Sequence, residues 1–154
     1  MEGKVNAMPE AAEGAGGFRT IRYELVQVGE TFMSDDLLVK PEDVETFAFA
    51  VDDHDPWWFA GSPLGTPAAH PVLLGNQALM MRHSRYIVPA GLHAKMQFEF
   101  LEPVRVGMRV RTYGKVIDKF VKRDRFYMVT QFETRNEADG TVLTRGQFTQ
   151  MLFD

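Results

Sequence analysis

Four histidines, together with any carboxylate whose pKa is shifted, are the groups of this sequence that could transfer protons near neutral pH. Two of them, His54 and His70, stand at the two ends of a loop that also carries Asp53. A carboxylate beside an imidazole stabilises the imidazolium and orients the ring, as general acid–base catalysis requires. The chain has no cysteine, which excludes thiolate catalysis, disulfides and cysteine-ligated metals. The histidines and acids also lack the paired spacing of metal ligands, so we expect no metal site.

The loop between residues 52 and 71 combines four prolines with a run of aromatic residues, Trp57, Trp58 and Phe59. Long loops inside a compact domain are commonly functional, and this one is too aromatic for a solvated linker. Trp57 and Trp58 are most simply core or dimer contacts, since aromatic residues bury large areas. The alternative, which makes them candidate substrate-binding residues, is that they form a wall of an acyl pocket or a clamp on an adenine. We interpret His83, late in a helix, and His93, on the polar face of a strand, as structural.

Two helices are expected around this loop. Pro41 and the acids after it mark a helix start, and apolar residues then recur at the i, i+3, i+4, i+7 spacing through Val51. A second helix is expected from His70 to about Arg85, with Pro71 in its first turn. Because this second helix is apolar on several sides, it should lie in the core.

Strands are expected in the rest of the chain. Alternating apolar residues predict a short strand over 21–25 and a clear one from residue 91 to 100, with Leu92, Ala94, Met96, Phe98 and Phe100 on its buried face. Three more strands follow, over about 108–121, 125–135 and 141–153, joined by tight turns, and the glycine at position 114 predicts a bulge or bend.

This order of elements predicts an α+β domain over residues 19–154, in which an antiparallel sheet wraps around one central hydrophobic helix. That is the hot-dog fold. Residues 1–18 lack periodicity and are interpreted as a flexible N-terminal tail. One helix cannot cover five strands, and long free edges favour pairing, so we expect a homodimer or a higher oligomer.

Charge and hydropathy exclude several classes of partner. The net charge of −4 and the pI near 5.6 argue against nucleic-acid binding. No apolar run approaches the roughly 20 residues that a membrane span needs. The first residues also lack the charged start and apolar core of a signal peptide, so we expect a cytoplasmic protein without membrane contact.

The segment FAFAVDDHDP, which ends at Pro56, and the later segment AAHP around His70 resemble the core motif of the MaoC-like hydratase and dehydratase family. These hot-dog proteins carry an Asp-x-Asn-Pro-x-His loop motif and an Ala-His-Gly motif at the start of the central helix. The order of elements is similar from Leu38 to Phe153. The resemblance implies addition or removal of water across the double bond of a 2-enoyl thioester. The thioester is carried on coenzyme A or acyl carrier protein, and no further cofactor is implied.

The match to this motif is incomplete at two working positions. Asp53 falls at the family's catalytic aspartate and Pro56 at its proline, with Asp55 in place of the asparagine. Trp58 stands where the family has its catalytic histidine, and an indole cannot accept and return a proton. Pro71 stands where the family has the glycine whose N–H holds the thioester carbonyl, and proline has no N–H.

Three functions are therefore open. The first is a hydro-lyase in which Asp53 and a histidine, His70 or His54, form the acid/base pair while the free N–H of Val72 or Leu73 at the helix start binds the carbonyl. The second is a non-catalytic hot-dog module that binds an acyl thioester or pairs with an active subunit. The third is a hot-dog acyl-CoA thioesterase.

Overall fold

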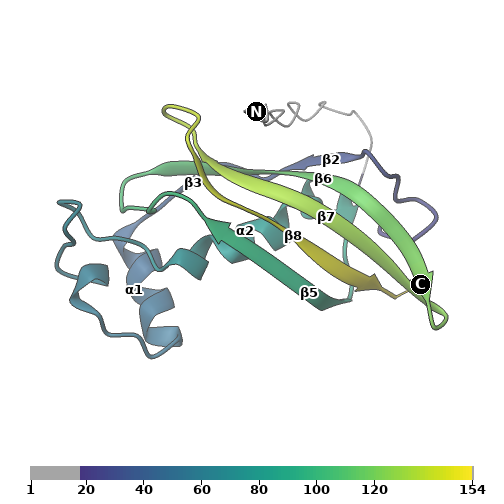
Figure 1. Cartoon of the computed structure of the whole chain (residues 1–154), viewed down its shortest axis with the longest axis horizontal. Coiled ribbons are helices and arrows are strands. Elements are labelled where there is room, and N and C mark those ends of the chain that lie inside the picture. Colours follow the sequence, from purple (N-terminus) through teal and green to yellow (C-terminus); the bar gives the residue numbers. More distant parts are fainter. Residues whose placement is uncertain (1–17, 154) are drawn as a thin grey trace, which may run out of the picture.

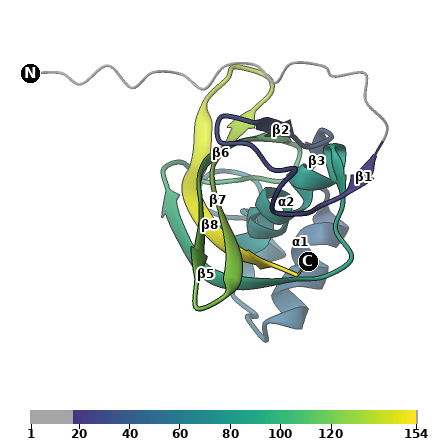
Figure 2. The same cartoon turned by 90° about the vertical axis from the view of Figure 1, so that its right-hand side faces the viewer.

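A six-stranded antiparallel sheet curves around a central helical segment in the computed structural model, which describes residues 18–153 (Figure 1, Figure 2). This α+β arrangement confirms the predicted hot-dog fold. The strands are β1 (Arg19–Thr20), β2 (Thr31–Met33), β3 (Leu37–Leu38), β4 (Tyr86–Ile87), β5 (Gly91–Phe100), β6 (Arg109–Lys122), β7 (Arg125–Asn136) and β8 (Val142–Leu152), and the α-helices are α1 (Pro41–Ala50) and α2 (Gly75–Met80).

The order of strands in the sheet is β2-β6-β7-β8-β5, and β3 also pairs with β6. Strands β6, β7 and β8 follow one another as hairpins, as predicted from their turn residues. Strand β5 precedes them in the chain but pairs with β8, which makes it an edge of the sheet. Strands β1 and β4 form a separate two-residue parallel pair.

Two apolar clusters fill the space between the sheet and the central helix. The first surrounds Ala78 and Met81 of the helical segment, which pack against the inner faces of β6, β7 and β8. The second lies at the start of the helical segment, where Ala69 and Leu74 pack with Val44 of α1. Ala69 and Leu74 are buried on either side of His70 in the chain. This second cluster therefore fixes the backbone that carries His70.

The central helix is divided rather than continuous from His70 to Arg85. It consists of a 3₁₀ helix (Pro71–Leu74), α2 and a second 3₁₀ helix (Met81–Ser84). The first helix agrees with the expected pattern more closely: α1 begins at Pro41, and its residues Val44 and Ala48 are buried.

The predicted strand over residues 21–25 is wrong. The extended pair β1 ends at Thr20, and the chain then turns, with the N–H of Val26 donating to the carbonyl of Arg22. The turn is held by Lys119, whose ammonium donates to the carbonyls of Tyr23 and Val26. The period-two pattern here came from burial of alternate residues in a turn, which periodicity alone does not separate from a strand.

Strand β5 has the predicted length, but its predicted face is buried only in part. Most of its residues are exposed because it lies at the sheet edge, while Phe98 of the predicted face packs against the core beside Gly75 of α2. A bulge between His93 and Lys95 also shifts its register against β8. This shift places His93 on the same face as the buried Gln150, and not on the polar face as predicted.

The bulge predicted at Gly114 occurs elsewhere on β6, between Val116 and Asp118. Gly114 has a different role, because the thioether end of Met81 occupies the place of a side chain there. Residues 1–17 of the predicted tail and residue 154 lie outside the described residues. No helix in the described part of the chain is long and apolar enough to cross a membrane.

Candidate active site

The loop that follows α1 is held in shape by its own aspartates. The N–H of Asp53 donates to the carbonyl of Ala48, which ties the loop to the last turn of the helix. The Asp53 carboxylate accepts from the N–H of Asp55 at 3.2 Å, and the Asp55 carboxylate accepts from the N–H of Trp57 at 2.9 Å. Such Asx turns fix the backbone locally. They leave the second oxygen of Asp53 free to face the helix start.

His70 stands at that helix start and faces Asp53. Its Nδ1 accepts the N–H of Val72 at 3.3 Å, so in the neutral ring the proton is on Nε2. This Nε2 lies 3.7 Å from Oδ2 of Asp53. The rings of Phe47 and Trp58 flank the imidazole, with centroids 5.2 and 5.6 Å away. The structure therefore brings together Asp53 and His70 from the two ends of the loop.

The electrostatics of the pair favour an ionised carboxylate. The Trp58 indole N–H is the main cause that lowers the pKa of Asp53, followed by the Asp55 backbone N–H, while partial burial acts in the opposite direction. The Trp58 Nε1 is buried and makes no hydrogen bond of normal geometry within residues 18–153, so it acts on Asp53 as a nearby dipole. The lowered pKa keeps Asp53 ionised at neutral pH, the form that can accept a proton, and makes it a weaker base than an unperturbed aspartate.

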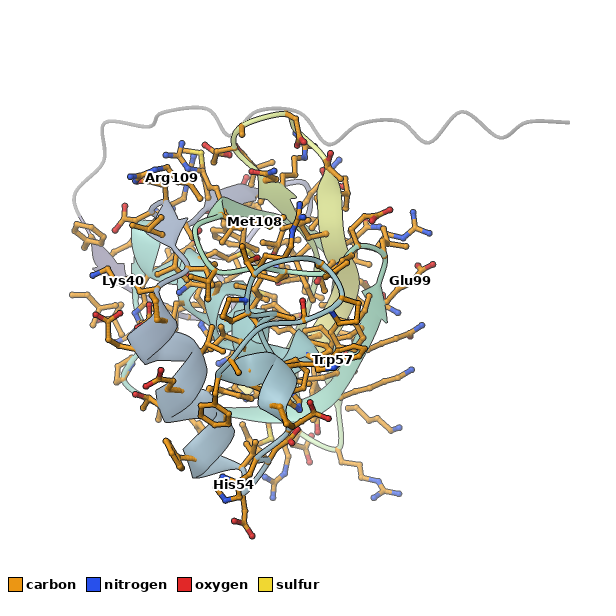
Figure 3. The ribbon with its side chains drawn as sticks, turned by 90° about the vertical axis from the view of Figure 1, so that its left-hand side faces the viewer. Lys40, His54, Trp57, Glu99, Met108 and Arg109 are labelled. Atoms are coloured by element: carbon orange, nitrogen blue, oxygen red, sulfur yellow. The ribbon has the colours of Figure 1, made fainter. Side chains whose placement is uncertain are left out.

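The structure separates His54 from this pair. Its Nε2 lies 3.0 Å from Oδ1 of Asp52, and both side chains are largely exposed. Figure 3 shows His54 at the outer end of the loop, away from Trp57. Of the two candidate histidines, His70 is thus the one in ion-pair distance of Asp53.

Both backbone N–H groups that we expected to hold a thioester carbonyl are already engaged. The N–H of Val72 donates to the His70 ring, and the N–H of Leu73 donates to the His70 carbonyl at 2.9 Å. Pro71 has no N–H to add. In this conformation the helix start does not present a free donor to a carbonyl, and Val72 would have to release His70 to provide one.

An apolar cavity of about 260 Å³ lies beside the pair. Trp57 and Trp58 line it, together with Ala69 and Pro71, the two chain neighbours of His70. Its far wall is the segment from Phe100 to Val104. Sequence patterns did not identify this wall, because the residues after β5 meet the loop only in the folded chain.

Two other hollows border the central helix. One of about 370 Å³ is lined by Phe47 and Leu73, on the side of the His70 ring where Phe47 lies. The larger one, of about 590 Å³, lies between the β2–β3 connection and the end of the helical segment near His83. Neither Asp53 nor His70 lines this hollow or the 260 Å³ cavity, but the 260 Å³ cavity is lined by the chain neighbours of His70 and the larger hollow is not.

The comparisons with known proteins address the family and the fold. Residues 26–145 match the family model described as "FAS1-like, dehydratase domain region". A comparison with curated proteins gives no match.

Several solved structures share the fold. The R-hydratase from Pseudomonas aeruginosa is 21% identical with a TM-score of 0.71, and the match covers 86% of each chain. The MaoC-like dehydratase from Rhodospirillum rubrum is 20% identical with a TM-score of 0.69, over 84% of this chain and 94% of the other. The 3R-hydroxyacyl-ACP dehydratase complex HadBC from Mycobacterium tuberculosis is 21% identical with a TM-score of 0.69, over 80% of this chain and 96% of the other. With the family model matching most of its length, the chain belongs to the FAS1-like dehydratase family and has the hot-dog fold of the MaoC-like dehydratases.

Proposed function

We propose that this protein is a hydro-lyase that adds water to a 2-enoyl thioester, or removes it from the 3-hydroxyacyl thioester. The single observation that carries the proposal is the approach of Asp53 Oδ2 to His70 Nε2 at 3.7 Å beside an apolar cavity. The similarity to solved structures named as a hydratase or a dehydratase supports the proposal. The coenzyme A or acyl-carrier-protein carrier and the cytoplasmic location are predictions from the sequence.

The chemistry needs one base and one acid. In the hydration direction, the Asp53 carboxylate accepts a proton from water while the water oxygen bonds to C3 of the enoyl group. The acid is the doubly protonated form of His70, because a neutral ring that lost its Nε2 proton would become an imidazolate. Protonation of Nδ1 releases the N–H of Val72. The Nε2 proton then passes to C2, which completes the addition of water and leaves a neutral imidazole. Proton transfer from Asp53 to His70 then restores the pair. In the dehydration direction the same transfers run backwards.

The test is hydration of 2-enoyl-CoA substrates from short to long chain, followed by loss of the enoyl-thioester absorbance. Asp53→Asn and His70→Ala should each lower kcat by about 10²-fold or more, because each removes one proton carrier. Asp52→Asn is the matched control, since its side chain is almost fully exposed and contacts His54 rather than His70. The proposal fails if the wild-type protein hydrates none of these substrates, or if the control loses as much activity as Asp53→Asn.

A second function is favoured by a specific set of observations. Trp58 occupies the position of the family's histidine, and the N–H groups of Val72 and Leu73 are engaged. A site of this kind could bind an acyl thioester without reacting and complete an active partner subunit. It predicts binding of coenzyme A esters with no turnover. Turnover by the protein alone would exclude this function, and release of free thiol would identify a thioesterase instead.

Binding can be followed without turnover. The chain has two tryptophans, and both line the 260 Å³ cavity, so occupation of the cavity should change the intrinsic fluorescence. Titration with a saturated acyl-CoA, which cannot be hydrated, therefore measures binding separately from catalysis.

We further propose that the protein forms a homodimer through β5. This ten-residue edge strand is paired on one side only, and its side chains Leu92 and Phe100 are 56% and 47% exposed. Free edges of this length pair readily with another strand. Leu92→Glu should shift the protein toward monomer in analytical ultracentrifugation. Val121→Glu, which changes an equally exposed residue on β6, should not.

A further inference from the structure

A buried cationic cluster lies at the other end of the central helical segment from His70. Its centre is Arg82, in the 3₁₀ helix Met81–Ser84, whose side chain is 7% exposed. Arg82 Nη1 donates to Oε1 of Gln150, a fully buried residue of β8. His93 shares this face of the sheet, because the β5 bulge places it directly opposite Gln150.

The cluster has hydrogen-bond donors without acceptors. Within residues 18–153, no carboxylate lies within 4 Å of the Arg82 guanidinium, and its Nε has no partner. The side-chain nitrogen Nε2 of Gln150, also buried, has none either. Buried donors and buried charges are ordinarily paired, because leaving either unpaired is costly. The described residues thus hold a buried positive charge with two unused donors.

The neighbouring groups respond to this positive charge. Burial lowers the pKa of Arg82 to about 10. Burial, and then the charge of Arg82, lower the pKa of both His83 and His93. The cluster therefore contains no second positive charge at neutral pH and no negative one, which leaves the field of the guanidinium uncompensated.

The backbone is adapted to keep Gln150 in this position. A Cβ on Gly91, the first residue of β5, would overlap Nε2 of Gln150. The glycine lets the strand edge pass close to the amide. His93, which is exposed, connects the buried pair to the open edge of the sheet. Because the two donor atoms are buried, an incoming group would have to enter along the face of β5 that carries His93, with the side chains there moving aside.

We propose that Arg82, Gln150 and His93 form a binding site for an oxyanion, a carboxylate or a phosphate, which accepts from Arg82 Nε and Gln150 Nε2. The proposal is independent of the hydro-lyase function, since the site lies away from Asp53 and His70. The oxyanion has two possible sources, a free anion in solution or a carboxylate of a second copy docked along β5.

The test for a free anion is thermal unfolding of the full chain in sodium acetate or sodium phosphate, compared with sodium chloride at equal ionic strength. At an anion concentration about tenfold above Kd, the Tm should rise by about 3–6 °C over the chloride value. Titration with acetate should also shift the Nε–H resonance of Arg82 in the NMR spectrum. This second readout needs no variant.

Gln150→Glu tests the same site by placing a carboxylate of the protein itself beside Arg82. The change keeps the shape of the side chain and provides a carboxylate to Arg82, so it should raise the Tm in chloride and abolish the response to acetate and phosphate. Gln147→Glu is the matched control, because it makes the same change on the outer face of β8 and should leave the anion response intact.

Dilution distinguishes the two sources. If the carboxylate comes from a second copy, the wild-type Tm rises with protein concentration without added anion, and Gln150→Glu removes this dependence. If the anion is free, the acetate response is the same at every protein concentration. The proposal is overturned if acetate and phosphate act no differently from chloride and the Tm is independent of concentration, or if Gln150→Glu lowers the Tm.

Discussion

Gly146, in the middle of β8, is the residue through which the stability of β5 can be tested most directly. A Cβ at this position would overlap the carbonyl oxygen of Gln97 on β5 and lie 3.0 Å from both the Gln97 carbonyl carbon and Cζ of Phe132. Close carbon–oxygen contacts in sheets settle at about 3.3 Å. The obstacle is backbone, which cannot rotate away as a side chain can, so Gly146→Ala has to push β5 off β8.

The expected cost combines overpacking of about 1–3 kcal/mol with weakened ladder hydrogen bonds worth about 1 kcal/mol each, hence at least about 3 kcal/mol of unfolding free energy. For a domain of this size, this corresponds to a fall in Tm of about 6–12 °C. The comparison variant is Gly114→Ala, whose Cβ would overlap the flexible end of Met81 and lie in ordinary contact with Thr130 Cγ2 at 3.4 Å; it should cost about 1–2 kcal/mol.

Urea unfolding of the two variants and the wild type provides the measurement. Weakened β5 should also lower the fraction of dimer for Gly146→Ala but not for Gly114→Ala. The reasoning is refuted if Gly146→Ala is within 1 kcal/mol of the wild type, or if Gly114→Ala is the more damaging change.

Two further predictions follow from shifted pKa values. Burial, and then the Glu30 carboxylate, raise the pKa of Tyr86 to about 12. Because an unfolded tyrosine ionises near pH 10, this stabilisation is complete below about pH 10 and is lost as the pH rises toward 12. The Tm should therefore fall across that range, and Glu30→Gln should lower the pKa of Tyr86 in an ultraviolet titration; an unchanged pKa would contradict the assignment. Trp58→Phe keeps a ring but removes the indole N–H, so it should raise the pKa of Asp53 toward that of unfolded aspartate, about 3.9. The wild-type Asp53 stabilises the fold above that pH and loses its effect as the pH falls through its lowered pKa. Carboxyl-carbon NMR titration measures the pKa of Asp53 in the wild type and in Trp58→Phe. Equal pKa values in the two proteins would exclude the indole as the cause.

The fold could be predicted largely from the sequence because its elements carry local signals. The hairpin turn at Arg123 and Asp124, both with positive φ, and the helix start at Pro41 are encoded by adjacent residues. The predictions of a strand over 21–25 and of the buried face of β5 failed for the same reason, which is that each depended on tertiary packing. Burial in a turn, and a single extra residue in a strand, each depend on what the rest of the chain packs against them.

The site was predictable in part for the same reason. Asp53 and His70 stand beside motifs at a loop end and a helix start, and their pairing needed only the closure of that loop. The engagement of the N–H of Val72 by the His70 ring depends on the rotamer of one side chain, which no spacing encodes. The cavity wall after Phe100 comes from a segment distant in sequence and could not be assigned locally.

The position of β5 in the sheet also determines when it can form. It leaves the ribosome before β6, β7 and β8, yet within residues 18–153 it pairs with β8, the last strand to be made. The hairpins β6–β7 and β7–β8 close between neighbours in the chain and can assemble early, whereas β5 waits for synthesis of the domain to end. During that interval its apolar side chains have no partner in the sheet. Nascent chains of this protein should therefore be most prone to aggregation, and most dependent on chaperones, just before β8 emerges.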